Sequence, residues 1–320
     1  MQGFPPELIH TAAELYALHQ PPAFFARSHQ HSRGCLYETG SYILKILRTD
    51  KPSDISTAEK RVRFARYLQS NGLLCQNFIY SKQHKLVELM KFQGEYFLIS
   101  AWLKIEALPH ADLHPNQLTD YYLNWAKLLA DTHRLSPHFR GNTPPHWHSE
   151  WQACYDSLPD EDVKSPLMTL KKSLDKRDSS AANFGFIHND AHPKNILENA
   201  EGLHLIDFDR SCTHFFVQDI ANAIYSEFSR VNFHSAHTAT TEEMAEYFLK
   251  PFLRAYLQAY PLPAEDLRDL ETFLYYRQII MFGIFYREIE AAAPEYLAIF
   301  RENILSRKPF LELDIAALCS

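Results

Sequence analysis

The sequence predicts an α+β protein of two lobes, a small antiparallel β lobe over residues 1–101 and a larger, mainly helical lobe over residues 102–320. Three observations lead to this prediction. Short runs rich in β-branched and aromatic residues fill most of the N-terminal third. A connector containing Leu108-Pro109-His110 follows them. Beyond the connector, apolar residues recur at helical spacing almost to the end of the chain.

The smaller lobe is expected to begin with a helix from Pro6 to His19, which Pro21-Pro22 ends. Strand-like runs are then expected at Ala23–Ser28, Gly34–Thr39, Ser41–Leu47, Gln76–Ser81, Leu86–Lys91 and Tyr96–Ala101. One helix separates the third run from the fourth. It begins near Ser53 or Asp54 and ends at Asn71, where Gly72 closes it.

Lys45 is the one cation inside the apolar run Ser41–Leu47. A lysine in such a strand must find an anionic partner or extend its amine to water. Taken alone, the residue fits an edge strand as well as a buried ion pair.

In the larger lobe, the apolar spacing predicts seven helices, with Pro251 interrupting the fifth. These helices are Pro115–Arg134, Trp147–Ser157, Ser165–Lys176, Val217–Ser229, Thr241–Tyr260, Ala264–Glu290 and Pro294–Ser306. A short hairpin is expected over Ile196–Ile206, turning at residues 199–202.

The composition limits the class of protein. A net charge of −7 and a pI near 6.2 show no excess of basic residues of the kind that binds nucleic acid. Five scattered cysteines without a C-x-x-C pair, and no signal peptide, indicate reduced thiols in a cytoplasmic protein. No apolar stretch is long enough to predict a membrane span. We expect a monomer or homodimer that binds neither nucleic acid nor membrane.

Polar residues that suit phosphate chemistry gather after two apolar strands. Asp190 follows Phe186-Ile187 in a turn restrained by Pro193, where a carboxylate can orient a hydroxyl or accept its proton. Asn195 and Asp207 flank the short hairpin, which should bring them side by side. Their oxygens are ligands that Mg²⁺ accepts, with phosphates and water completing its shell.

These motifs, over His188–Leu197 and Leu205–Asp209, resemble the aminoglycoside phosphotransferase and choline kinase-like family of the protein-kinase fold. The chain is most similar to the bacterial group labelled homoserine-kinase-type-II-like or stress-response-kinase-like. The resemblance implies a protein-kinase-like bilobal fold with ATP and Mg²⁺ as cofactors. It also implies transfer of the γ-phosphoryl group to a hydroxyl of a small molecule, such as an aminoglycoside-, choline- or homoserine-like acceptor.

The same resemblance implies roles for single residues. Asp190 would be the catalytic base, and Asn195 and Asp207 would hold the metal. Asp209 would assist in binding the metal, although it equally suits a solvated or capping role. Lys45 would contact the ATP phosphates.

Glu59 would orient that lysine in the nucleotide site. His188 and Asp219 would support the catalytic loop. The chain has no G-x-G-x-x-G loop, so Ser32 and Arg33 are candidates for covering the phosphates.

Three other functions compete with this one. The first is a protein Ser/Thr kinase of the stress-response type. Residues 210–216 lead directly into a helix and leave no recognisable activation segment, which favours a small or flexible acceptor over regulation by loop phosphorylation and still allows a protein substrate. A nucleotide-binding pseudokinase-like regulator would not need the complete set of site residues. A metal hydrolase using His188, Asp190 and His192 would leave Lys45 and Glu59 unexplained. Candidates for the acceptor pocket, or for ordinary surface and packing positions, are His192, Lys194, Arg210, Arg230, Tyr286 and Arg287.

Overall fold

A computed structural model describes residues 3–27, 34–108, 113–140, 145–233, 235 and 237–311. The chain forms two compact units. The first comprises Met1–Leu108, Phe139–Pro144 and Leu197–Asp209, and the second comprises Pro109–His138, Pro145–Ile196 and Arg210–Ser320. The first is built on an antiparallel sheet and the second is mainly helical, so the α+β prediction is confirmed.

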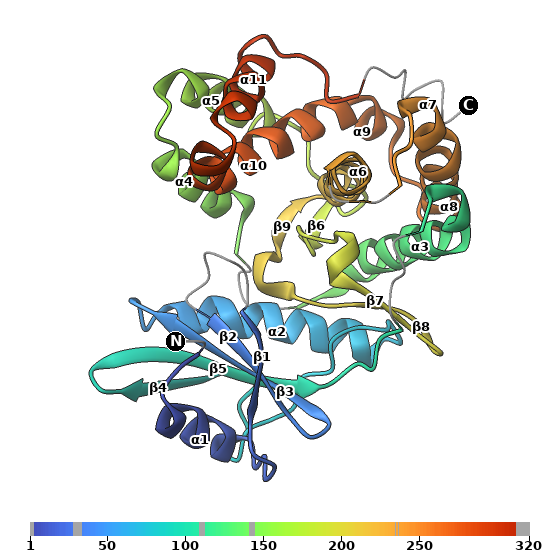
Figure 1. The fold of residues 1–320 in the computed structure, drawn as a ribbon. Helices are drawn as coiled ribbons and strands as arrows, with labels where there is room; N and C mark the ends of the chain where they lie inside the picture. The colour runs from blue at the N-terminus through green and yellow to red at the C-terminus, as the bar shows by residue number, and fades with distance from the viewer. Residues whose placement is uncertain are drawn as a thin grey trace. The chain divides into compact units, whose positions relative to one another are not determined.

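The sheet of the first unit has the strand order β1-β2-β3-β5-β4, with every neighbouring pair antiparallel (Figure 1). Its strands are β1 (Ala23–Arg27), β2 (Gly34–Thr39), β3 (Tyr42–Thr49), β4 (Glu88–Phe92) and β5 (Glu95–Leu103). Helix α1 (Pro6–Leu15) lies against this sheet and buries Leu8 and Ala12 in a core with Leu44, Ile46 and Ile99. Alternation along β3 and β5 therefore supplies the apolar face that α1 covers.

Helix α2 (Asp54–Ser70) lies on the other side of the sheet from α1 (Figure 1). It buries Val62, Phe64, Ala65 and Leu68 at helical spacing. The helix ends as expected, since the following Gly72 has φ +88°, a conformation that a glycine adopts without strain.

The hairpin of β7 (Ile196–Asn199) and β8 (Gly202–Leu205) attaches to the segment after α2. The Leu205 N–H donates to the Leu74 carbonyl at 3.0 Å, and the Gln76 N–H donates to the Leu205 carbonyl at 3.0 Å. The Ile79 N–H instead donates to Ala101 of β5. Because this segment changes partner along its length, the regular strand expected at Gln76–Ser81 does not form, and that prediction is wrong.

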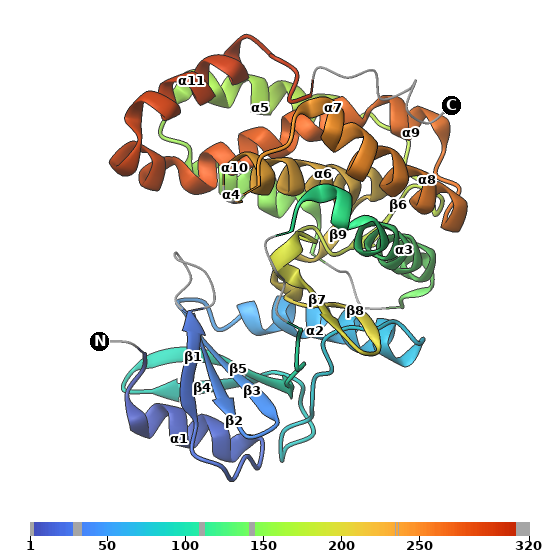
Figure 2. The same cartoon turned by 45° about the vertical axis from the view of Figure 1, so that its right-hand side comes forward.

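The second unit contains an antiparallel ribbon of β6 (Phe184–Ile187) and β9 (Cys212–Phe215), with helices packed around it (Figure 2). The longer helices are α3 (Thr119–Leu135), α4 (Trp147–Ser157), α5 (Glu161–Leu174), α6 (Phe216–Phe233), α8 (Lys250–Ala259), α10 (Leu270–Ala292) and α11 (Pro294–Leu305). The short ones are α7 (Thr241–Met244), α9 (Ala264–Arg268) and the 3₁₀ turns η1 (Pro115–Gln117), η2 (Ser136–His138), η3 (Pro193–Asn195) and η4 (Phe208–Arg210).

Two helix boundaries differ from expectation for local reasons. Helix α5 begins at Glu161 rather than Ser165, because the Asp160 carboxylate accepts the N–H of Asp162 at 3.0 Å and caps it. The helix expected at Ala264–Glu290 breaks at Asp269, which pairs with Arg177 together with the buried Asp266.

The interruption expected at Pro251 takes the form of a π-helical turn, η5 (Ala245–Leu249), between α7 and α8. Proline lacks an N–H and its ring crowds the preceding turn, so a wider turn before it keeps the helical path continuous. Phe248 and Phe252 from this stretch pack on Trp125 of α3.

No helix in the described part of the chain is both long and apolar enough to cross a membrane. Cys35, Cys75, Cys154 and Cys212 are free and buried thiols. Cys319 lies outside the described residues.

Candidate active site

The loop from His188 to Asn195 follows β6 and ends in η3. Asn189 has φ +62°, in the left-handed region that asparagine tolerates better than most residues. The Asn195 side-chain amide donates to the Asp190 carbonyl at 2.9 Å, and the Asn195 N–H donates to the His192 carbonyl at 2.7 Å. These bonds close the loop and place the Asp190 side chain at its turn.

Asp219, in the first turn of α6, holds the start of this loop. Its buried carboxylate accepts the backbone N–H of His188 at 3.0 Å and that of Asn189 at 2.6 Å. The ring of His133 lies 3.2 Å from the same carboxylate through Nε2, and its Nδ1 lies 2.6 Å from the Tyr256 hydroxyl. A chain of buried polar groups thus fixes the loop backbone.

His188 itself points inward. It is fully buried, and its Nδ1 accepts the Asp190 N–H at 3.2 Å. The His188 ring is thus enclosed within the turn, and the supporting roles of His188 and Asp219 stay predictions.

Asp190 is a buried carboxylate with a buried cation beside it. Arg277 of α10 donates from Nη2 to Asp190 Oδ1 at 2.8 Å. Burial alone would raise the pKa of Asp190, but the positive charges of Arg277, Arg210 and His192 together hold that pKa well below its usual range. Asp190 is therefore an anion at neutral pH, able to accept a hydrogen bond from a hydroxyl while being only a weak base.

A second ion pair lies next to the loop. Arg210 pairs with Glu150 of α4, and the Asn189 amide donates to Glu150 Oε2 at 3.0 Å. Burial would lower the pKa of Arg210, but Glu150 and Asp190 raise it, so the guanidinium stays charged. Asn189 is thereby held from its side chain as well as its backbone.

Sequence reasoning missed Arg277 and Glu150. The signal for Arg277 was present, because a charge two residues before the apolar run Ile279–Phe282 needs a partner if its helix is buried. Glu150 gave no such signal, since an acidic residue in the first turn of a helix is ordinary.

In the first unit, Lys45 lies on β3, the middle strand of the sheet. It is opposite Leu36 of β2 and Ser100 of β5. It is buried and forms ion pairs with Asp209 and, at 3.8 Å, with Asp207 Oδ1. Burial would lower the pKa of Lys45, but the two carboxylates raise it, so the amine remains protonated. The edge-strand interpretation of Lys45 is therefore wrong.

Asp207 is held in a specific backbone conformation. It has φ +62°, and its N–H donates to the Gln76 side-chain oxygen at 3.0 Å. The segment after β8 thereby turns both carboxylates, Asp207 and Asp209, toward Lys45.

Three other predicted site residues, Glu59, Ser32 and Arg33, are not among these contacts. Among the described residues, Lys45 pairs with Asp207 and Asp209 and makes no ion pair with Glu59 of α2. Orientation of Lys45 by Glu59 stays a prediction. Ser32 and Arg33 lie outside the described residues.

The oxygens available for a metal are of the type that Mg²⁺ prefers. Asp207 and Asp209 offer carboxylates in the first unit. In the second unit, Asn195 offers its side-chain oxygen, because its Nδ2 is engaged by the Asp190 carbonyl. No group of three or more His, Cys, Asp and Glu within the described ranges could hold a metal ion. Carboxylate and amide oxygens are each ligands that Mg²⁺ accepts while it retains phosphate and water ligands.

The structure thus brings the predicted site residues together in two sets. The first unit assembles Lys45, Asp207 and Asp209. The second assembles His188, Asp190, Asn195 and Asp219.

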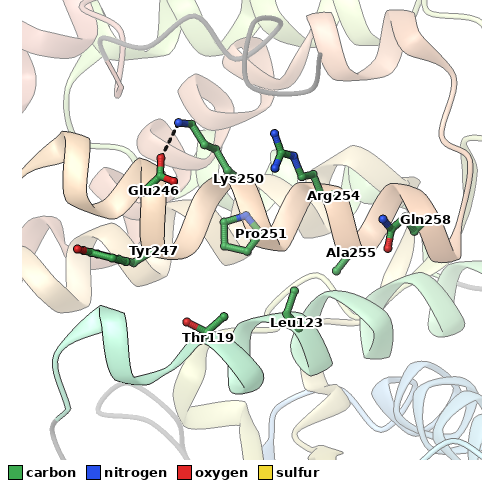
Figure 3. Close-up of a pocket in the computed structure, with 9 residues that line it drawn as sticks. All are labelled: Thr119, Leu123, Glu246, Tyr247, Lys250, Pro251, Arg254, Ala255 and Gln258. Carbon is green, nitrogen blue, oxygen red and sulfur yellow. Dashed lines mark hydrogen bonds and ion pairs between the residues drawn. The ribbon is translucent and has the colours of Figure 1, made fainter.

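A separate pocket of about 370 Å³ opens between α3 and α8 (Figure 3). Thr119 and Leu123 line it from α3, while Lys250 and Arg254 line it from α8. None of the predicted site residues contributes to its lining.

Comparison with known proteins identifies the class. The model of the phosphotransferase enzyme family, APH, matches residues 27–267, which is more than half of the chain. The chain therefore belongs to the phosphotransferase enzyme family, and the resemblance found in the sequence is confirmed. A comparison with curated protein sequences found no match.

Solved structures show the same fold. An amicoumacin kinase in complex with AMP-PNP, Ca²⁺ and Ami has a TM-score of 0.86 at 22% identity, covering 99% of this chain and 98% of its own. A microcompartment-associated aminopropanol kinase has a TM-score of 0.71 at 16% identity, covering 94% of this chain and 98% of its own. A spectinomycin phosphotransferase in complex with ADP and spectinomycin has a TM-score of 0.55 at 16% identity, covering 100% and 98%. The kinase-like fold prediction is confirmed.

Proposed function

We propose that the protein is a kinase that uses ATP and Mg²⁺ to phosphorylate a hydroxyl of a small molecule. The observation that carries this proposal is Asp190, a buried carboxylate kept ionised by Arg277 on a loop that Asp219 braces. A fixed anion at a loop turn is suited to receive the hydroxyl of an acceptor.

The low basicity of Asp190 is compatible with phosphoryl transfer. The transition state of this reaction is loose, so the attacking hydroxyl keeps its proton until late and needs orientation more than early deprotonation. Asp190 would accept the hydroxyl hydrogen bond throughout and take the proton as the new P–O bond completes. Catalysis would then come mainly from positioning.

Lys45, Asp207 and Asp209 would form the nucleotide side of the site. One cation and two carboxylates leave this group with a net charge of −1, which favours an added cation. We infer that Lys45 moves from these carboxylates to the ATP phosphates, freeing Asp207 and Asp209 to bind the metal with Asn195. Charge developing on the phosphate oxygens would be neutralised by Mg²⁺ when it is bound. The AMP-PNP, Ca²⁺ and ADP complexes of the relatives support nucleotide and divalent-metal use.

A small acceptor is favoured over a protein acceptor by the segment after Asp209. Only Ser211 separates η4 from β9, so no long loop is available there for regulation by phosphorylation. The relatives named for amicoumacin, aminopropanol and spectinomycin also support a small hydroxylated acceptor.

The proposal also covers the cellular location, the oligomeric state and the roles of the two lobes. We infer a cytoplasmic monomer or homodimer without nucleic-acid partners, in keeping with its net charge of −7 and scattered cysteines. Residues 1–101 would serve as the nucleotide-covering lobe, with Glu59, Ser32 and Arg33 completing the phosphate site. Residues 102–320 would carry the catalytic loop and the acceptor site.

The experiment is a thermal shift with ATP and Mg²⁺, followed by a screen of hydroxylated metabolites and antibiotics for ADP production. Ligand at 100 times its dissociation constant should add about 2.7 kcal/mol of stability. Asp190→Asn should keep this shift and lose turnover, and Asp178→Asn, an exposed aspartate, should change neither. The absence of any shift with the wild-type protein would refute the proposal.

A further inference from the structure

The side chain of Gln76 reaches from the segment after α2 to the backbone of Asp207. Gln76 is 4% exposed, and its side-chain oxygen accepts the Asp207 N–H at 3.0 Å. Its own backbone N–H donates separately to the Leu205 carbonyl at 3.0 Å. The β7–β8 hairpin is therefore attached through the backbone of Gln76, and the side-chain bond to Asp207 is an addition that this attachment does not require.

Asp207 has a backbone conformation that needs support. Its φ of +62° lies in the left-handed region, which residues other than glycine rarely occupy. A glycine would adopt this conformation without strain but would supply no carboxylate. Rotation about the N–Cα bond is the angle φ, and Gln76 fixes the N–H at one end of that bond. The hydrogen bond therefore opposes relaxation of Asp207 toward an extended conformation.

The residue after Asp207 is fixed as well. Phe208 is 2% exposed, and its ring centroid lies 6.2 Å from that of Phe64 of α2. The Asp207 side chain, in contrast, is 23% exposed, with Oδ1 3.8 Å from Lys45 Nζ. All of these residues belong to the first unit. A backbone held on both sides thus presents a partly accessible carboxylate oxygen, an arrangement suited to receive a cation without rearrangement of the chain.

We propose that Gln76 is a positioning residue for the metal. By accepting the Asp207 N–H, its side-chain oxygen keeps the Asp207 carboxylate in place to bind Mg²⁺, and it thereby raises the affinity of the protein for the nucleotide with its metal. This inference rests on the proposed kinase function, which it deepens by adding a residue to the metal site. Groups that hold a metal ligand from behind typically change metal affinity by about 10–100-fold when they are removed.

The test is calorimetric titration of the full-length protein with AMP-PNP, once with Mg²⁺ and once with EDTA. The ratio of the two affinities is the metal enhancement. Gln76→Met keeps the length of the side chain and removes its oxygen, so it should lower the metal enhancement by at least ~10-fold. The affinity measured in EDTA should stay within about 3-fold of wild type. Gln83→Met, at an exposed glutamine of the same unit, should leave both affinities unchanged.

A double-mutant cycle separates positioning of Asp207 from general structural support. Gln76→Met should lower the metal enhancement when Asp207 is present, and it should have no further effect once Asp207→Asn has removed the charged ligand. A role in stability alone would instead lower the melting temperature of the free protein and leave the metal enhancement as in the wild type.

Amide exchange in the wild type gives a second readout that needs no variant. If the bond to Gln76 supports the metal-binding conformation, metal binding must in turn favour that bond. Exchange of the Asp207 N–H, followed by NMR with AMP-PNP bound, should therefore slow by at least ~5-fold when Mg²⁺ is added.

The outcomes distinguish this inference from the kinase proposal. A wild-type protein that binds AMP-PNP no more tightly with Mg²⁺ than with EDTA refutes the kinase proposal itself. With a metal-dependent wild type, an unchanged metal enhancement in Gln76→Met overturns the role of Gln76, and so does an equal effect of that substitution with and without Asp207→Asn. If Gln76→Met does not fold, the exchange measurement decides, and an Asp207 N–H whose exchange is indifferent to Mg²⁺ overturns the proposal.

Discussion

Replacing Asp219 by asparagine should lower the free energy of unfolding by about 2–4 kcal/mol. The buried carboxylate accepts two backbone N–H groups, from His188 at 3.0 Å and Asn189 at 2.6 Å. An asparagine keeps one oxygen and turns an NH₂ group toward the other donor. The change removes one hydrogen bond to a charged group, worth about 1.5–3 kcal/mol, and leaves a buried donor unsatisfied at an overlapping cost of about 1–3 kcal/mol.

The measurement is urea denaturation followed by far-ultraviolet circular dichroism and tryptophan fluorescence. Coincident transitions from the two probes are needed before a free energy is extracted, because the chain has two compact units. Asp178→Asn is the control, since Asp178 is exposed and should shift stability by no more than about 0.5 kcal/mol. If Asp219→Asn matches that control, the carboxylate does not brace the loop and the reasoning fails.

Other positions make independent tests. Gly185→Ala should lower stability by about 1–3 kcal/mol through overpacking, since the added methyl would meet the Ser136 hydroxyl and lie 3.0 Å from the Phe216 ring; a wild-type melting temperature would contradict it. Burial raises the pKa of Cys75 and Cys154 to about 12, so their thiolate fraction, and hence their alkylation rate, should be far below that of an exposed thiol between about pH 7 and 9. Mass spectrometry with iodoacetamide should find both thiols unmodified until urea unfolds the protein, and rapid modification of the native protein would refute their burial. Arg177→Ala should cost about 3–5 kcal/mol, because it leaves the buried Asp266 carboxylate without its cation, and a loss below about 1 kcal/mol in urea denaturation would show that this pair is not structural.

Much of the fold was accessible from local sequence patterns. The period of apolar residues located α2, α3, α4 and α6 because each buries one face of a helix. The hairpin between Asn195 and Asp207 was also predicted correctly as β7 and β8, since turn residues and short strands are encoded locally. Failures occurred where local patterns do not choose the partner, as at Gln76–Ser81, which bonds in turn to two different neighbours.

The partners of buried charged side chains were harder to predict than the helices and strands. Arg277 meets Asp190 across 87 residues of sequence, and helical spacing does not reveal which turn of a helix faces a distant loop. The ion pairs of Lys45 with Asp207 and Asp209 were likewise not predicted from the sequence. A buried charge can therefore be recognised from sequence by its need for a partner, while the partner's identity depends on the tertiary fold.

The most direct test of the kinase proposal is calorimetric titration of AMP-PNP with and without Mg²⁺, using wild type, Asp207→Asn and Asp190→Asn. The proposal predicts metal-dependent binding by the wild type, a loss of at least ~10-fold in that affinity for Asp207→Asn because a charged metal ligand is removed, and wild-type affinity for Asp190→Asn. Binding that is indifferent to Mg²⁺, or equal in wild type and Asp207→Asn, would contradict the assignment of Asp207 to the metal and Asp190 to the acceptor.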